Sequence, residues 1–179
     1  MDVRRLREKI GFVSQKANLF SGTIEENIRF GREDASEEEM IRAAKIAQAY
    51  DFIMEKPGQF QERIVEGAGN LSGGQKQRLS IARALIRQPQ IYIYDDSFSA
   101  LDLKTDARLR KALKQEITDA IVIIVAQRVS TILDADRIIV LDEGRVAGMG
   151  RHEELLRECP LYYEIAASQL SEEELQHVR

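Results

Sequence analysis

The stretch Ile91-Tyr92-Ile93-Tyr94-Asp95-Asp96 is a run of four apolar residues that ends in two acids. Such a run predicts a short buried β-strand, with the two carboxylates at its carboxyl end. The next apolar run, residues 121–126, is apolar at every position, which is typical of a central strand covered on both faces. These two runs predict the middle of a β-sheet.

Strand-like and helix-like segments alternate outward from this centre. Capping boxes at Ser36 with Glu39 and at Ser72 with Gln75 mark two helix starts. Strands are expected at 10–14, 91–94, 121–126, 137–141 and 145–147, and helices at 36–56, 72–88, 105–116, 152–157 and 161–170. The alternation predicts an α/β fold with a mostly parallel sheet, in which ligands gather at the carboxyl ends of the strands. Gln127 follows one such end.

The composition excludes several classes of protein. The 179 residues are 44% apolar and 31% charged, which is typical of a globular domain. The net charge of −4 gives no global attraction to nucleic acid. A single cysteine, Cys159, cannot form a disulfide within the chain. The longest apolar run, 120–126, is far short of the ~20 residues that cross a bilayer.

Two motifs point to nucleotide chemistry. In Leu71-Ser72-Gly73-Gly74-Gln75, two glycines leave the backbone bare in the first turn of a helix, where free N–H groups can bind phosphate. In the strand at 91–94, the first carboxylate after the strand can hold Mg²⁺ and the second can orient a water molecule. Each motif alone also fits a well-capped structural helix or an ordinary turn.

Together these motifs resemble those of the ATP-binding-cassette (ABC) transporter family, over about residues 6–163. The residues 71–75 are similar to its signature motif, 91–95 to its Walker B strand and 99–102 to its D-loop. Gln15 is similar to the Q-loop glutamine, and Gln127 stands where the switch histidine is expected. The resemblance implies a P-loop NTPase-like fold in which a helical subdomain carries the signature motif.

The resemblance also implies cofactors, site residues and domain boundaries. ATP and Mg²⁺ are the expected cofactors. The expected roles are catalytic for Asp96 and Gln127, metal-binding for Asp95 and Gln15, and nucleotide-binding for Leu71, Ser72, Gly73, Gly74, Gln75 and Asp102. Residues 1–165 are expected to form a partial ABC ATPase domain, with a helical subdomain at about 30–90 within a RecA-like core. Residues 166–179 are expected to be a C-terminal tail.

An exporter is the expected subtype. The segment Leu19–Ile28 resembles the part of exporter ATPase domains that follows the Q-loop, and Glu66 resembles a glutamate placed against membrane domains. A plain surface loop and a solvated charge are the simpler alternatives. The expected partners are a second ABC ATPase domain and the transmembrane domains of an exporter, with no nucleic acid. The expected location is the cytoplasmic face of the cell membrane, reached through membrane domains that are not in this chain.

The sequence departs from the family pattern in three places. It has no Gly-x-x-x-x-Gly-Lys-Ser/Thr, so the phosphate loop and the first strands are expected to be missing, and Met1 resembles the start of a fragment. Such a chain is expected to expose apolar strand surface and to be marginally stable. Asp96 stands where catalytic members have glutamate, and Gln127 cannot carry a proton as histidine does.

These departures resemble the degenerate half of heterodimeric exporters. In the family, two ATPase domains dimerise head to tail, and each signature motif completes the site of the other domain. Asp96 and Gln127 would then belong to a weak site of this chain, and Ser72 to the partner's site. The alternative is a docking or dimerisation module without enzymatic activity, or the inert remnant of a truncated gene, which the DNA upstream of Met1 would distinguish. A DNA- or ribosome-acting ABC protein fits the acidic charge poorly.

Overall fold

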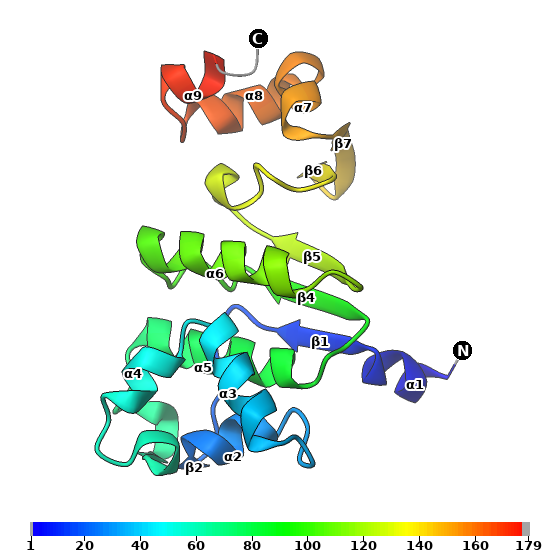
Figure 1. Cartoon of the computed structure of the whole chain (residues 1–179). Coiled ribbons are helices and arrows are strands. Elements are labelled where there is room, and N and C mark those ends of the chain that lie inside the picture. Colours follow the sequence, from blue (N-terminus) through cyan, green and yellow to red (C-terminus); the bar gives the residue numbers. More distant parts are fainter. Residues whose placement is uncertain (1, 177–179) are drawn as a thin grey trace. The chain divides into compact units, whose positions relative to one another are not determined.

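A computed structural model describes residues 2–176, and these form two compact units (Figure 1). The first unit extends to Val125 and the second begins at Ala126. The helices and strands of the first unit are α1 Val3–Glu8, β1 Ile10–Val13, β2 Gly22–Thr23, α2 Ile24–Arg29, α3 Glu37–Ile46, α4 Tyr50–Met54, η1 Gln59–Gln61, β3 Arg63–Ile64, η2 Glu66–Ala68, α5 Gly73–Ile86, β4 Ile91–Asp95, α6 Leu103–Glu116 and β5 Ile121–Val125. The second unit contains η3 Val129–Thr131, β6 Ile138–Asp142, β7 Arg145–Gly150, α7 His152–Glu158, α8 Pro160–Ala167 and α9 Glu172–Gln176.

The sheet of the first unit is parallel, with the strand order β1-β4-β5. Phe12 of β1 lies opposite Ile93 of β4, which in turn lies opposite Ile123 of β5. Helix α5 packs on β1 and also against α2 and α3, so helices enclose the core of this unit (Figure 1). The predicted α/β class with a parallel sheet is confirmed, and all three strands end at the same edge.

The predicted helix starts at Ser36 and Ser72 are confirmed. The hydroxyl of each serine accepts a hydrogen bond from the third helical N–H, and the backbone N–H of the serine donates to the side chain of that third residue. The predicted helix after Ser36 is interrupted, however, because Gln48 takes a left-handed conformation with φ 57° between α3 and α4. Helix α6 begins two residues before the predicted position, since Asp102 caps it.

The second unit is built on a hairpin rather than on the parallel sheet. Strands β6 and β7 pair antiparallel through a turn at Glu143 and Gly144, whose φ values are both positive, as a tight hairpin requires. Its small core joins the hairpin to α7 and α8 and contains Val129, Ile138, Val140, Leu155, Cys159, Tyr162 and Ala166. The predicted tail at 166–179 includes the end of α8 and all of α9, and residues 177–179 lie outside the described part of the chain.

The prediction that the apolar run after residue 120 forms a buried central strand is wrong for this chain. Strand β5 pairs with β4 on one side and is the last strand of its sheet. Ile121, Ile123 and Val125 are 61%, 46% and 51% exposed. A strand with the sequence of a central strand therefore lies at the edge of the described sheet, with apolar side chains exposed.

No helix within residues 2–176 is both long and apolar enough to pass through a lipid bilayer.

We expect the open face of β5 to make the isolated chain self-associate. Replacing Ile123 by lysine (I123K) should reduce light scattering at fixed concentration, because it places a charge on the exposed face. The matched variant I124K places lysine on the opposite face, where Ile124 packs against the core. It should lower the free energy of unfolding by about 2 kcal/mol or more. A sharp two-state melt of monomeric wild-type chain would contradict this expectation.

Candidate functional site

Polar residues meet where the parallel strands β1 and β4 end. Asp95 is the last residue of β4, and Gln15 lies two residues beyond β1. The Gln15 Nε2 donates to the Asp96 Oδ2 at 3.1 Å, and the Asp96 N–H donates to the Val125 carbonyl at 2.9 Å. The structure thus brings three predicted site residues, Gln15, Asp95 and Asp96, to one edge of the sheet.

The backbone of Asp96 is held in an unusual conformation. Its φ of 45° lies in the left-handed region, which aspartate tolerates better than most residues other than glycine. The Ser99 Oγ donates to the Asp96 carbonyl at 2.8 Å, so the turn after β4 is closed by a side chain. This turn directs the Asp96 carboxylate towards the Gln15 side chain.

Two buried side chains fix the loop that carries Gln15. The Ser97 Oγ donates to the Val13 carbonyl at 2.9 Å, and the Gln77 Nε2 donates to the Ser14 carbonyl at 3.1 Å. Ser97 is fully buried and Gln77 is 1% exposed. Buried polar groups are costly unless bonded, so these bonds specify where β1 stops. Neither residue is among the predicted site residues, although a glutamine on the apolar face of a helix is a usable signal.

The N-terminus of α5 is exposed, as its predicted role requires. Ser72 Oγ accepts from the Gln75 N–H at 3.2 Å, and Gln75 Oε1 accepts from the Ser72 N–H at 3.0 Å. A Cβ added at Gly73 would meet nothing within 4 Å, so the backbone there faces open space. A Cβ at Gly74 would lie 3.3 Å from the Ala100 carbonyl oxygen, which places the predicted D-loop beside this turn. Leu71 is buried beneath it.

Asp102 has a structural task that accounts for its position. Its Oδ1 accepts from the Thr105 N–H at 2.9 Å and caps α6. Hydrogen bonds from the Thr105 side chain and backbone hold the pKa of the Asp102 carboxyl below its ordinary value. The predicted contact of Asp102 with nucleotide, like those of Leu71, Ser72, Gly73, Gly74 and Gln75, stays a prediction.

Gln127 belongs to the second unit and is exposed there. Its carbonyl accepts from the Gln169 Nε2 at 3.0 Å. Its predicted catalytic role, as well as that of Asp96, stays a prediction.

The edge of the sheet has the chemistry that Mg²⁺ prefers. Asp95 offers carboxylate oxygens, and Gln15 offers an amide oxygen because its nitrogen is engaged by Asp96. Within residues 2–176, no three His, Cys, Asp or Glu side chains gather closely enough to hold an ion on their own. This arrangement fits Mg²⁺, which is commonly held by one or two side chains, waters and substrate phosphates. The ATP phosphates would have to be held largely by groups outside this set.

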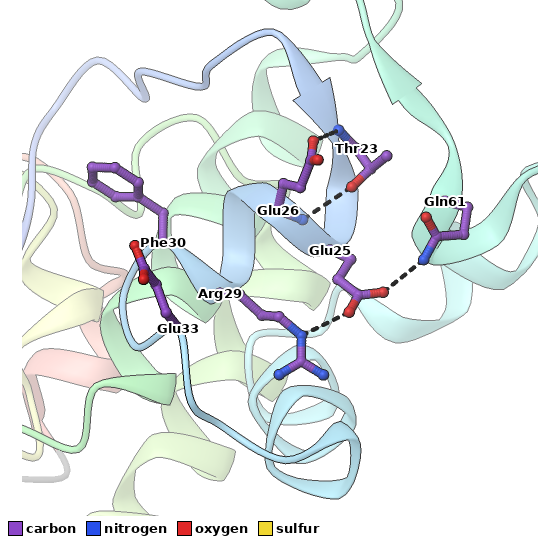
Figure 2. Close-up of a pocket in the computed structure, with 7 residues that line it drawn as sticks. All are labelled: Thr23, Glu25, Glu26, Arg29, Phe30, Glu33 and Gln61. Carbon is purple, nitrogen blue, oxygen red and sulfur yellow. Dashed lines mark hydrogen bonds and ion pairs between the residues drawn. The ribbon is translucent and has the colours of Figure 1, made fainter.

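A groove of about 480 Å³ runs along α2 (Figure 2). Its walls include three glutamates, Glu25, Glu26 and Glu33, and the exposed ring of Phe30. Glu25 accepts from both Arg29 and Gln61 at 2.7 Å, which ties α2 to the segment after Gly58 (Figure 2). The groove is therefore acidic with one aromatic wall. The side chain of Glu66 lies outside the described part of the structure.

Arg83 of α5 supports this groove from inside. Its guanidinium donates to the carbonyls of Asn27 and Asn18 and to the Asn27 Oδ1, each at 2.8 Å. It also lies over the rings of Phe20 and Phe30, at 5.0 and 5.7 Å from their centroids. Burial lowers the pKa of Arg83 from its ordinary value, yet that value is so high that the charge is kept. The segment after Gln15 and the helix of the signature motif are thus joined through one side chain.

Comparisons with known proteins identify relatives of the chain. The family model described as ABC transporter matches residues 1–99. An uncharacterized ABC transporter ATP-binding protein of Mycobacterium tuberculosis is 48% identical over 168 residues, which are 92% of this chain and 28% of the relative. The human ATP-binding cassette sub-family B member 5 is 47% identical over 94% of this chain and 13% of its own length.

A solved structure has the same fold. It is a bacterial Atm1-family ABC exporter with ATP bound, and it matches with a TM-score of 0.89 and 41% identity. The match covers 94% of this chain and 30% of the exporter chain. The chain therefore spans less than a third of the length of these relatives.

Proposed function

The chain belongs to the ABC transporter family, and on that premise we propose that it acts as part of the nucleotide-binding ATPase domain of an exporter. In this proposal it works with ATP and Mg²⁺ in a head-to-tail pair of ATPase domains. Its place of work is the cytoplasmic face of the membrane. ATP binding and hydrolysis there would drive transport by membrane domains to which the chain docks.

The exposed N-terminus of α5 is the observation that carries the proposal. Its first turn is free of side chains at Gly73 and faces open space. The hydroxyl of Ser72 and the amide of Gln75 hold the turn in shape through their reciprocal bonds. Free N–H groups and the positive end of the helix dipole then attract a phosphate. In the head-to-tail arrangement this phosphate belongs to ATP held by the partner domain.

The residues around Asp96 would serve a second, weaker site. Asp95 and Gln15 would hold Mg²⁺, and Asp96 would orient the attacking water. Aspartate is one methylene shorter than the glutamate of catalytic members, and small errors in geometry can cost about 100-fold in rate. Gln127 would bond the γ-phosphate without supplying a positive charge. We infer that this chain's own site hydrolyses ATP slowly, while its α5 completes a competent site on the partner.

The groove along α2 is the proposed docking site for the membrane domains. Thr23, Glu25 and Glu26 of its lining belong to the segment Leu19–Ile28, which resembles the corresponding part of exporters. Its acidic walls and the exposed Phe30 ring fit a cytoplasmic helix or loop with basic and apolar side chains. Arg83 of α5 bonds Asn27 beside the groove. The proposed docking site and the proposed nucleotide site are thus connected through the same helix.

Replacing Ser72 by aspartate (S72D) tests the role of α5 in trans. Aspartate still caps the helix but places a negative charge against the incoming phosphate. We expect the ATPase rate of the assembled pair to fall by about tenfold or more, with unchanged thermal stability. The matched control is S36D, the same substitution at the N-cap of α3, which should keep full activity. An S72D pair that hydrolyses ATP at the wild-type rate would contradict the proposal.

The double variant D96E/Q127H tests whether the chain's own site is degenerate. We expect it to raise turnover at that site by about tenfold, because it supplies a better placed base and a chargeable switch residue. The measurement uses the S72D pair, in which the partner's site is slowed, so that a gain in turnover at this chain's own site stands out against a lower background. Asp119 is exposed, so D119E is the matched control and should leave the ATPase turnover unchanged. Unchanged turnover in D96E/Q127H would refute the degenerate-site interpretation.

Replacing Phe30 by aspartate (F30D) tests the docking groove. A second exposed aromatic residue, Tyr163, lies in the other unit and provides the control Y163D. We expect F30D to weaken retention of the chain by the exporter's membrane domain about tenfold in a co-purification assay, as loss of an aromatic interface residue does. Y163D should be retained like the wild type. Equal retention of both variants would exclude the groove as the docking site.

A further inference from the structure

One side chain holds two backbone groups beside Gln127. Residues 127–129, here called the switch loop, lead into the short helix η3. The Gln169 Nε2 donates to the Gln127 carbonyl at 3.0 Å, and the Gln169 Oε1 accepts from the Val129 N–H at 2.9 Å. Gln169 lies just after α8, in the segment that the sequence predicted to be a tail. A residue 40 positions from Val129 and 42 from Gln127 thus bonds both ends of the switch loop.

The switch loop needs this partner because η3 cannot cap itself. The first N–H of a helix has no partner within the helix, and the Arg128 side chain at the N-cap carries no acceptor. Val129 is 2% exposed, so an unbonded N–H there would be costly. The Gln169 oxygen supplies the missing cap, and its nitrogen engages the Gln127 carbonyl at the same time.

Gln169 is itself anchored to the core of the second unit. Its own N–H and that of Leu170 both donate to the Ala166 carbonyl, at 3.0 and 2.8 Å. Ala166 is fully buried, and Leu170 packs against the same core. The backbone from which the Gln169 side chain extends is therefore held in place by this core. A carboxamide carries a donor and an acceptor side by side, so it can hold both backbone groups, which a carboxylate cannot.

We propose that Gln169 is a positioning residue for Gln127. It fixes the backbone of the switch loop and so sets the direction in which the Gln127 side chain points. This inference rests on the proposed function, since Gln127 faces the γ-phosphate only there. If Gln169 had only a structural role, removing its side chain would destabilise the whole second unit rather than the switch loop alone.

The two hydrogen bonds from Gln169 to the switch loop are here called the clamp. Amide hydrogen exchange in the full chain measures the strength of the clamp and requires no ATP. We expect Q169A to speed exchange at the Val129 N–H about tenfold, the effect of losing one hydrogen bond. The Cys159 N–H, which donates to the Leu155 carbonyl in the same unit, should keep its rate. The Q169E variant keeps the acceptor and should give an intermediate rate. The control S168A should change neither rate, because that hydroxyl bonds the local Ile165 carbonyl.

Turnover then connects the clamp to Gln127. In the D96E/Q127H pair carrying S72D in the same chain, we expect Q169A to lower kcat by about tenfold with KM nearly unchanged, as loss of alignment in the transition state does. Q169E should lower kcat less than Q169A, and S168A should leave it unchanged.

The outcomes separate the two proposals. Unchanged exchange at Val129 in Q169A, or equal acceleration at Val129 and Cys159, would overturn the clamp. Faster exchange at Val129 alone with an unaltered kcat would overturn its role in positioning residue 127. If D96E/Q127H brings no gain in turnover, the degenerate-site proposal fails, and exchange at Val129 still decides whether Gln169 holds the switch loop.

Discussion

The parallel pairing of β4 with β1 on one side and β5 on the other is the constraint on which the candidate site depends. Val13 lies opposite Tyr94, and Asp95 lies opposite Val125, so the three strands end within a residue or two of each other. Because they run in one direction, the loops after them leave from the same edge. This shared edge places Gln15 near Asp96, and the turn at Asp96 completes their hydrogen bond, although 81 positions separate them in sequence. An antiparallel β1 would carry Gln15 to the opposite edge.

The helix α5 connects the two functional parts of the first unit. Its N-terminus presents Ser72 and Gly73 to the outside, while Gln77, one turn further along, bonds the carbonyl of Ser14. Arg83, further along the same helix, holds Asn27 beside the acidic groove. These three contacts lie on one α-helix, whose residues are joined by a continuous ladder of backbone hydrogen bonds. In the proposed function, nucleotide at the partner's site, the loop of Gln15 and the docking groove therefore all act on one rigid element.

The sequence predicts what is decided locally and misses what depends on distant contacts. Capping boxes place the starts of α3 and α5, and apolar runs place β4 and β5, because each signal lies within a few residues. Gln77 and Gln169 bond partners 63 and 42 positions away. A local pattern can mark Gln77 as a polar residue on an apolar helix face, but it cannot predict what either side chain bonds. The exposure of β5 shows the same limit. Its apolar pattern shows that the strand is suited to a buried position between neighbours. The pattern does not show whether those neighbours are present in this chain.

The charges of the first unit explain why its two functional parts would serve different nucleotides. The edge at β4 presents Asp95 and Asp96 with the neutral Gln15, a set whose chemistry suits Mg²⁺ and a bound water but repels phosphate. The N-terminus of α5 presents unpaired N–H groups and no carboxylate in its first turn. It therefore attracts phosphate, whereas the edge at β4 repels it. A triphosphate bound by α5 therefore needs its metal and its water from other carboxylates. In the proposed head-to-tail pair the partner domain would supply them, and this complementarity between unlike surfaces would give a physical reason for the domains to work in pairs.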